Sequence, residues 1–238
     1  MFFSVIKFIE KNIFTLLLKV KWSFPYRNNM TDSFIGNKVA MFVILFLVCN
    51  EVPADIQFLL DASGSVGAPN FSKQKGFVAN FARSFTIGPN NIRIGVTTFS
   101  NAVHPQFSLN KYNGKSALVN AIRNIPYSKG GTNTDMALKW VASNSFNKSA
   151  GDRNNAANIV IVMTDGKSRN SNLTKQEANR LHRAGIKVFA IGIGSKVVKD
   201  ELKNIASSPE NVFTVVSFNV LDSILSKLKK STCKGKTA

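Results

Sequence analysis

From residue 55 onward, short apolar runs alternate with longer segments in which apolar positions recur at every third or fourth residue. The short runs are rich in Val, Ile and Phe and mostly lack polar alternation, which is typical of strands buried on both faces of a parallel sheet. They predict strands at residues 55–60, 92–99, 158–164, 187–192 and 212–216. The amphipathic segments predict helices at residues 70–84, 115–124, 134–145, 175–184, 199–206 and 220–230.

This alternation predicts an α/β fold with a doubly wound, mostly parallel open sheet that is flanked by helices on both faces. Residues 103–109 predict one short antiparallel strand at the sheet edge, where Pro105 is tolerated. In the segment 173–184, Thr174 is a candidate N-cap because Glu177 follows three positions later, and Gly185 is expected to end the helix. No internal repeat divides residues 55–230, so we expect one domain, followed by a short basic tail at 231–238.

Residues 1–54 follow a different pattern, with one continuous apolar run at residues 39–49. This run is too short to cross a bilayer, but it has the length of the hydrophobic region of a signal peptide. Small residues at Val52 and Ala54 fit a signal-peptidase cut ahead of Asp55. We therefore predict a leader at residues 1–54, secretion of the chain, and no transmembrane span. The segment before Met30 is hypothesised to be a nonfolding leader or a gene-model extension.

The chain carries a net charge of +18, and residues 55–238 retain 25 basic and 10 acidic residues. This excess favours polyanionic partners such as nucleic acid, acidic polysaccharide or anionic membrane, although a solvated surface explains it equally. Specific nucleic-acid binding is not expected, because most aromatic residues are Phe within apolar runs, where core packing explains them better than base stacking. For a secreted chain, sulfated glycans fit this surface better. One basic cluster comprises Lys227, Lys229, Lys230, Lys234 and Lys236.

Small oxygen-bearing side chains follow two of the predicted strands and precede one predicted helix. Asp61, Ser63 and Ser65 form a D-x-S-x-S pattern after the first strand, and Asp165 follows the strand at 158–164. Thr132 lies in the loop "KGGTNTD". In open α/β sheets ligands bind beyond the carboxyl ends of the strands, so we expect these three loops to converge.

Three kinds of chemistry fit a D-x-S-x-S loop: a nucleophile, a phosphate loop and a metal site. Neither serine has a G-x-S-x-G context and no His is placed as a base, so hydrolysis is not expected. There is no P-loop motif, and Gly192-Ile193-Gly194 lacks the third glycine of a dinucleotide loop, so we interpret these glycines as close packing and a turn. Oxygen donors alone favour Mg²⁺, Mn²⁺ or Ca²⁺. We therefore expect a metal site and no enzyme activity.

The segments "DIQFLLDASGSVG", "KGGTNTDMAL" and "IVIVMTDGKS", in this order, resemble the von Willebrand factor type A (VWA) domain of matrilins, nonfibrillar collagens and integrin inserted domains. The resemblance covers residues 55 to about 230 and implies a Rossmann-like fold with a metal-ion-dependent adhesion site. It implies that Ser63 and Ser65 are direct ligands and that Thr132 binds directly or through water. Asp61 and Asp165 would hold the ion largely through waters. Mg²⁺ or Mn²⁺ is implied, with Ca²⁺ as a further candidate, and an acidic side chain of the partner would complete the coordination.

The resemblance implies a secreted adhesion or matrix-binding module whose partner is an extracellular matrix or cell-surface protein. Two alternatives stay open: a basic glycan-binding matrix component with a secondary metal site, and an intracellular VWA subunit of an ATP-driven assembly. Cysteines often flank the domain in extracellular members, as Cys49 and Cys233 do, but cleavage after Ala54 would remove Cys49 and leave Cys233 unpaired. In some members the C-terminal helix, here 220–230, is movable.

Overall fold

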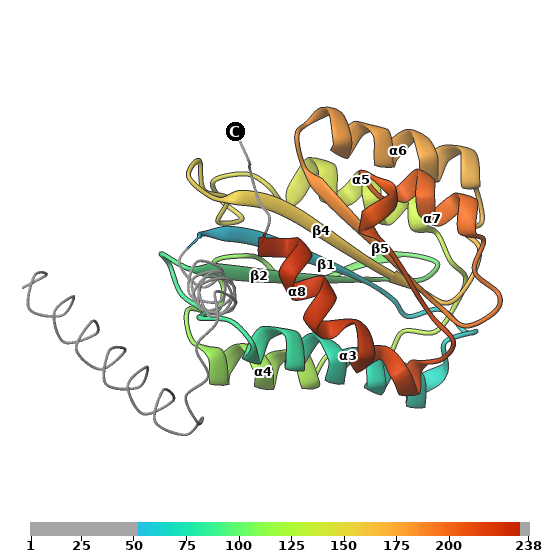
Figure 1. The fold of residues 1–238 in the computed structure, drawn as a ribbon, viewed down its shortest axis with the longest axis horizontal. Coiled ribbons are helices and arrows are strands. Elements are labelled where there is room, and N and C mark those ends of the chain that lie inside the picture. Colours follow the sequence, from blue (N-terminus) through green and yellow to red (C-terminus); the bar gives the residue numbers. More distant parts are fainter. Residues whose placement is uncertain (1–51, 234–238) are drawn as a thin grey trace, which may run out of the picture. The chain divides into compact units, whose positions relative to one another are not determined.

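The computed structural model of the protein describes residues 52–233, which contain a six-stranded sheet covered by helices (Figure 1). The strand order is β3-β2-β1-β4-β5-β6, and all neighbouring strands are parallel except β2 and β3. The predicted doubly wound sheet with one antiparallel edge strand is therefore confirmed. The strands are β1 Ala54–Asp61, β2 Ile92–Phe99, β3 Val103–Phe107, β4 Ala157–Thr164, β5 Lys187–Ile193 and β6 Val212–Val215.

The helices lie close to their predicted positions, with two exceptions. They are α3 Gly67–Arg83, α4 Lys115–Arg123, α5 Thr134–Asn144, α6 Ser171–Arg183, α7 Lys199–Ile205, α8 Leu225–Cys233 and the 3₁₀ helices η1 Pro209–Asn211 and η2 Phe218–Ile224.

The first exception is the predicted single helix at residues 220–230, which is instead η2 followed by α8. Short polar side chains in η2 favour tight local bonds over an α-helical ladder, and the Ser223 hydroxyl donates to the Val220 carbonyl.

The second exception is the predicted N-cap Thr174, which is wrong. Helix α6 begins earlier, at Ser171, and Asn170 is its N-cap because its Oδ1 accepts a hydrogen bond of 3.0 Å from the Leu173 N–H. Thr174 is fully buried inside the helix. The predicted end of the helix is confirmed, since Gly185 follows with a φ of 72°.

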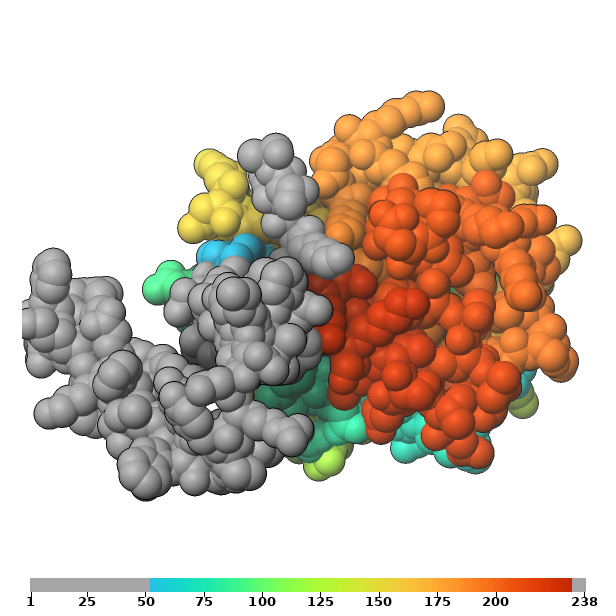
Figure 2. All heavy atoms as spheres, viewed as in Figure 1, coloured from blue at the N-terminus to red at the C-terminus, as the bar shows by residue number. Residues whose placement is uncertain are grey.

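Two hydrophobic cores lie on opposite faces of the sheet, as the alternation of side chains along β1 shows. Ile56, Phe58 and Leu60 belong to the core beneath α3, α4 and α8, whereas Leu59 belongs to the core beneath α5, α6 and α7. Figure 1 shows these two sets of helices on the two sides of the sheet. Figure 2 shows η2 and α8 (red) as one continuous part of the molecular surface, beside residues of α6 and α7 (orange).

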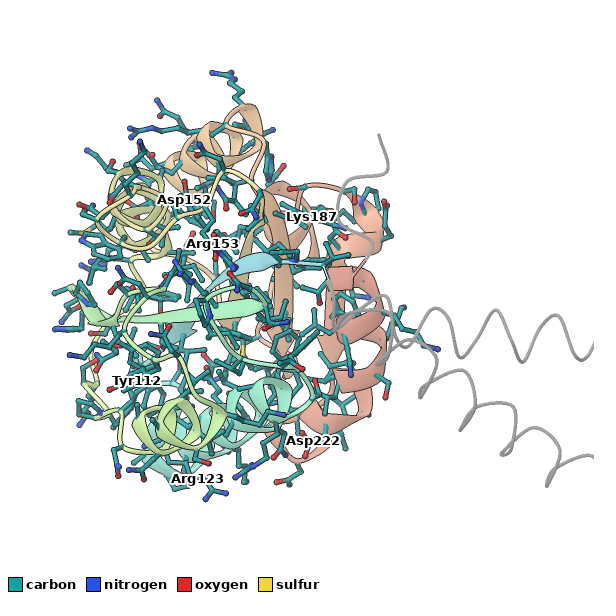
Figure 3. All side chains as sticks on the ribbon, turned by 90° about the vertical axis from the view of Figure 1, so that its left-hand side faces the viewer. Tyr112, Arg123, Asp152, Arg153, Lys187 and Asp222 are labelled. Carbon is teal, nitrogen blue, oxygen red and sulfur yellow. The ribbon has the colours of Figure 1, made fainter. Side chains whose placement is uncertain are left out.

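A buried ion pair between Asp55 and Arg153 stabilises the start of β1. Asp55 is fully buried, and Arg153 Nη2 lies 2.7 Å from its Oδ1. The same guanidinium donates to the carbonyls of Ala54, Pro89 and Asn91 (Figure 3 labels Arg153). The pair therefore connects β1 with the segment before β2.

Several predictions fall outside the described residues. These are the leader up to residue 51 with Cys49, the tail from residue 234, and any bond of Cys233, whose side chain is also outside the description. Within residues 52–233, no helix has the length and apolar character needed to span a membrane.

Candidate metal site

The predicted site residues lie on three loops at the carboxyl edge of the sheet, beside the neighbouring strands β1 and β4. Asp61 is the last residue of β1, Asp165 directly follows β4, and Thr132 precedes α5. The two strands are paired in parallel, with Leu60 opposite Met163. The strand order reverses between β1 and β4, which is the point where open α/β sheets bind ligands.

Four of the five predicted residues are joined by hydrogen bonds. The Ser63 and Ser65 hydroxyls lie 3.1 Å apart, and the Ser65 hydroxyl donates to Asp165 Oδ1 at 2.9 Å. The backbone N–H of Ser63 donates to Asp61 Oδ1 at 2.9 Å. The structure therefore brings two carboxylates and two hydroxyls into one small cluster of oxygen atoms.

Thr132 is connected to this cluster through the backbone. The Gly64 N–H donates to the Gly130 carbonyl at 2.7 Å, and the Arg169 N–H donates to the Thr132 carbonyl at 2.9 Å. Gly130 has a φ of 124°, and a Cβ atom there would lie 3.0 Å from the Asn101 amide. A glycine is needed at this position so that the loop before α5 can lie against Asn101 in the loop between β2 and β3.

Burial governs the protonation of both carboxyl groups. Asp61 is fully buried, and this burial raises its pKa, although hydrogen bonds from Ser63 and Thr164 oppose the rise. The nearby charge of Asp165 raises the pKa of Asp61 further. Burial also raises the pKa of Asp165, against the opposing effects of the Ser65 hydroxyl and the charge of Lys196.

The donor set and its charge fit a divalent cation. Within residues 52–233, neither Asp61 nor Asp165 forms an ion pair, and the side-chain donors bonded to them are hydroxyls. Two buried carboxylates that form no ion pair are unfavourable in the ionised state unless they bind a cation or a proton. Among residues 52–233, no cluster of three or more His, Cys, Asp or Glu side chains could hold a metal ion. The available ligands of the site are therefore the oxygen atoms of two carboxylates and the hydroxyl groups, which are hard donors.

Three further residues support the cluster and were not predicted. The Thr164 hydroxyl donates to Asp61 Oδ2 at 2.7 Å, Gln74 Nε2 donates to the Asp61 carbonyl, and the Tyr127 hydroxyl donates to the Ser63 carbonyl. Thr164 could have been found from the sequence, because it directly precedes Asp165 at the end of the same strand. Gln74 and Tyr127 reach the site only through the packing of α3 and of the loop after α4.

The two histidines lie away from the cluster, and the glycine pair at the end of β5 has a structural role. His182 Nε2 lies 3.0 Å from the Ile205 carbonyl, and His104 is exposed on the edge strand β3. A Cβ atom on Gly192 would lie 2.4 Å from Leu202, and Gly194 has a φ of 89°. The interpretation of these two glycines as close packing and a turn is therefore confirmed.

Comparison with known proteins identifies the family. The sequence model of the von Willebrand factor type A domain matches residues 55–227, and the chain belongs to this family. Over 190 residues the chain is 36% identical to the collagen alpha-4(VI) chain of Mus musculus, covering 78% of this chain and 8% of that one. Over 191 residues it is 34% identical to matrilin-1 of Mus musculus, covering 78% of this chain and 38% of that one. These relatives are extracellular matrix proteins rather than enzymes.

Solved structures agree with this assignment. Proximal thread matrix protein 1 from the mussel byssus, with a zinc-occupied MIDAS motif, superposes with a TM-score of 0.73 at 36% identity. The match covers 76% of this chain and 48% of that protein, so the chain spans less than half the length of each of these three relatives. Manganese-loaded TRAP protein of Plasmodium vivax, at 22% identity and a TM-score of 0.62, shares the fold.

Proposed function

We propose that the chain is a secreted module that binds an extracellular matrix or cell-surface protein through a divalent cation. Asp61, Ser63, Ser65, Thr132 and Asp165 would hold the cation at the carboxyl edge of the sheet. The bound cation would supply a positive charge that accepts an acidic side chain of the partner.

One observation carries this proposal: two buried carboxylates share a cluster with two hydroxyls, and neither carboxylate forms an ion pair with any residue from 52 to 233. The two carboxylates formally balance the charge of a divalent ion, while the hydroxyls add ligands without charge. Where the carboxylates act through water, the ion keeps its attraction for a further anionic ligand. Such a site favours ligand binding over turnover.

Hard oxygen donors support Mg²⁺ or Mn²⁺ as the ion, with Ca²⁺ as the third candidate. Proximal thread matrix protein 1 held zinc in its MIDAS motif, which supports a divalent cation at the matching loops of this chain.

Similarity to collagen and matrilin supports an extracellular location and a matrix partner. The same similarity argues against the alternative of an intracellular subunit in an ATP-driven assembly. N-terminal sequencing of chain secreted from expressing cells tests the location. A mature chain that begins at Asp55 is expected, and a mature chain that begins at Met1 would contradict the predicted leader.

The function is tested by measuring binding of the full chain to a panel of immobilised matrix proteins in Mg²⁺ and in EDTA. We expect binding to at least one of them in Mg²⁺, with loss in EDTA and in the Asp61→Asn variant. Asp200→Asn is a matched control because Asp200 is an exposed carboxylate on α7 that pairs with Lys203 and lies outside the cluster. Equal binding in EDTA and by Asp61→Asn would show that the metal site is not the interaction site.

A further inference from the structure

The two helical layers of the domain differ strongly in charge. The helices α5, α6 and α7 hold six basic and four acidic residues, whereas α3, α4, η2 and α8 hold eight basic residues and a single acidic one, Asp222. The excess positive charge of the described helices is therefore concentrated on one side of the sheet. The eight basic residues are Lys73, Lys75, Arg83, Lys115, Arg123, Lys227, Lys229 and Lys230.

Several of these cations meet at the C-terminal end of α3. Lys115 Nζ donates to the Arg83 carbonyl at 3.0 Å, and Lys229 Nζ donates to the Ser84 carbonyl at 2.6 Å. Free carbonyls at the end of a helix attract positive charge, and here they hold two lysines from α4 and α8 together. Burial, and then the charge of Lys115, lower the pKa of Lys229. The local fold thus keeps like charges close.

Three of these basic residues line a surface hollow beside α4. It is lined by Arg83, Lys115 and Arg123, together with Ser116, Val119 and Asn120, and no acidic residue lines it. The Arg123 side chain is exposed and forms no hydrogen bond or ion pair within residues 52–233. Three cations without carboxylates make this hollow suited to an anionic ligand.

A second hollow on the neighbouring face of α4 has a different lining. Its walls include the amide side chains of Gln106, Asn120 and Asn124 and the ring of Tyr112, which packs edge-on against Phe107 with centroids 5.1 Å apart. Tyr112 and Arg123 are both labelled near α4 in Figure 3. Amides can donate to and accept from hydroxyl groups, and a fixed aromatic ring offers an apolar face.

The two hollows are neighbours, because the exposed side chain of Asn120 lines both of them. Lys115 and Arg123 are eight residues apart on α4, which corresponds to about 12 Å along the helix. A ligand that fills both hollows is therefore extended, carries several negative charges, and has hydroxyl groups along its length. We propose that the exposed side of α4, with the C-terminal end of α3, is a binding site for a sulfated glycosaminoglycan.

Other polyanions fit this surface less well. None of the large exposed hydrophobic residues of the described chain lies on α3, α4 or α8, so the surface lacks side chains that would insert into a membrane. Tyr112 is half-buried against Phe107, which leaves no row of exposed rings for the bases of a nucleic acid.

The glycan site uses none of the proposed metal ligands. Helix α3 begins two residues after Ser65 and is about 25 Å long, so the Arg83 end of the glycan site lies at the end of α3 away from the metal site. The Arg123 end lies nearer, because Lys75 of α3 donates to the Arg123 carbonyl. Glycan binding should therefore need no divalent cation, and this inference goes beyond the proposed function without depending on it.

The test measures binding of the full chain to immobilised heparin in EDTA. We expect binding at physiological salt, and no binding to chemically desulfated heparin of the same length. The double variant Arg83→Gln/Arg123→Gln should weaken binding at least about tenfold. It should also reduce the slope of log affinity against log salt by about two, since two cations are removed.

Two further variants locate the site. Lys175→Gln/Arg183→Gln is the matched control, because it removes the same charge from exposed positions on α6 in the opposite layer. It should leave heparin binding nearly unchanged. Asn120→Ala keeps the net charge at a position exposed on α4, and it should weaken binding without changing the salt slope.

Four results would overturn the proposal. If the α6 control variant loses as much heparin binding as Arg83→Gln/Arg123→Gln, the net charge of the chain rather than a defined site binds the heparin. Equal binding of heparin and desulfated heparin would show that the site does not recognise sulfate groups. Loss of heparin binding in EDTA would show that the site depends on a divalent cation. Tighter binding of a single-stranded oligonucleotide of similar length, lost in the same double variant, would reassign the surface to nucleic acid.

Discussion

The Ser65 hydroxyl donates a hydrogen bond of 2.9 Å to Asp165 Oδ1, although the two residues are 100 positions apart in the chain. The bond joins the loop after β1 to the loop after β4, and it exists because these two strands are neighbours in the sheet. A hydroxyl and a carboxylate are thereby held side by side with their oxygens at the sheet edge.

Replacing Ser65 with Ala should separate metal binding from stability. The variant removes one proposed ligand and one hydrogen bond to Asp165, but Ser65 is exposed, so no buried donor is lost. We expect a cost of about 1 kcal/mol or less in the free energy of unfolding in EDTA, and clearly weaker Mn²⁺ binding by calorimetry. Unchanged Mn²⁺ affinity would show that the Ser65 hydroxyl is not a ligand.

The Asp61→Asn variant should abolish metal binding without destabilising the fold. Asp61 is fully buried, and no cationic side chain neutralises it within the described region. An amide retains an oxygen for the Ser63 N–H and can donate to the Thr164 hydroxyl, while it removes the buried charge. In EDTA at neutral pH we therefore expect the free energy of unfolding of the variant, measured in urea, to equal that of wild type or to exceed it by about 1 kcal/mol. A large destabilisation in EDTA would mean that Asp61 serves chiefly the fold.

Stabilisation by a cation should depend on pH. Burial raises the pKa of Asp61 and Asp165 above the ordinary value of 3.8. Between the ordinary and the raised pKa, the folded chain without a cation binds more protons than the unfolded chain, so its free energy of unfolding falls as pH rises through that window. A cation needs the ionised carboxylates. The increase in Tm on adding Mg²⁺ should thus be larger at about pH 7.5 than at about pH 4.5, and an equal increase would contradict these ligands.

The buried pair at the other end of β1 gives a prediction about stability alone. Arg153→Ala leaves Asp55 buried without a counter-charge and should cost about 3–5 kcal/mol in urea unfolding. Burial raises the pKa of Asp55 even with Arg153 present, so a carboxylate without a counter-charge is disfavoured at this position. The double variant Asp55→Asn/Arg153→Met should be less destabilised than Arg153→Ala. The reverse order would mean that the arginine acts mainly through packing.

The sequence predicts most strands well because each buried strand is a short run of β-branched and aromatic residues between polar loops. The observed β2, Ile92–Phe99, has the predicted limits. Helix starts are harder, as α6 shows: Asn170 and Thr174 are both chemically able to cap, and only the packing of Thr174 into the core decides between them.

Much of the candidate site also follows from the sequence, since Asp61 and Asp165 follow strands whose carboxyl ends share one edge. The hydrogen bonds that hold Asp61, Ser63, Ser65 and Asp165 together could not be predicted, because they depend on how the two loops fold against each other. The same is true of Tyr127, whose contact with Ser63 spans 64 positions and depends on how the loop after α4 returns to the sheet. The basic hollow beside α4 was not predicted, because the residues that line it, Arg83, Lys115 and Arg123, are far apart in the sequence.

A titration of the full chain with Mn²⁺, followed by the electron paramagnetic resonance signal of the free ion, tests the central claim most directly. The account predicts one bound Mn²⁺ per chain, displaced by Mg²⁺. It predicts that Asp165→Asn loses this ion while the control Asp200→Asn retains it. Equal Mn²⁺ binding by wild type and Asp165→Asn, or no binding by wild type, would contradict a cation site at the carboxyl edge of the sheet.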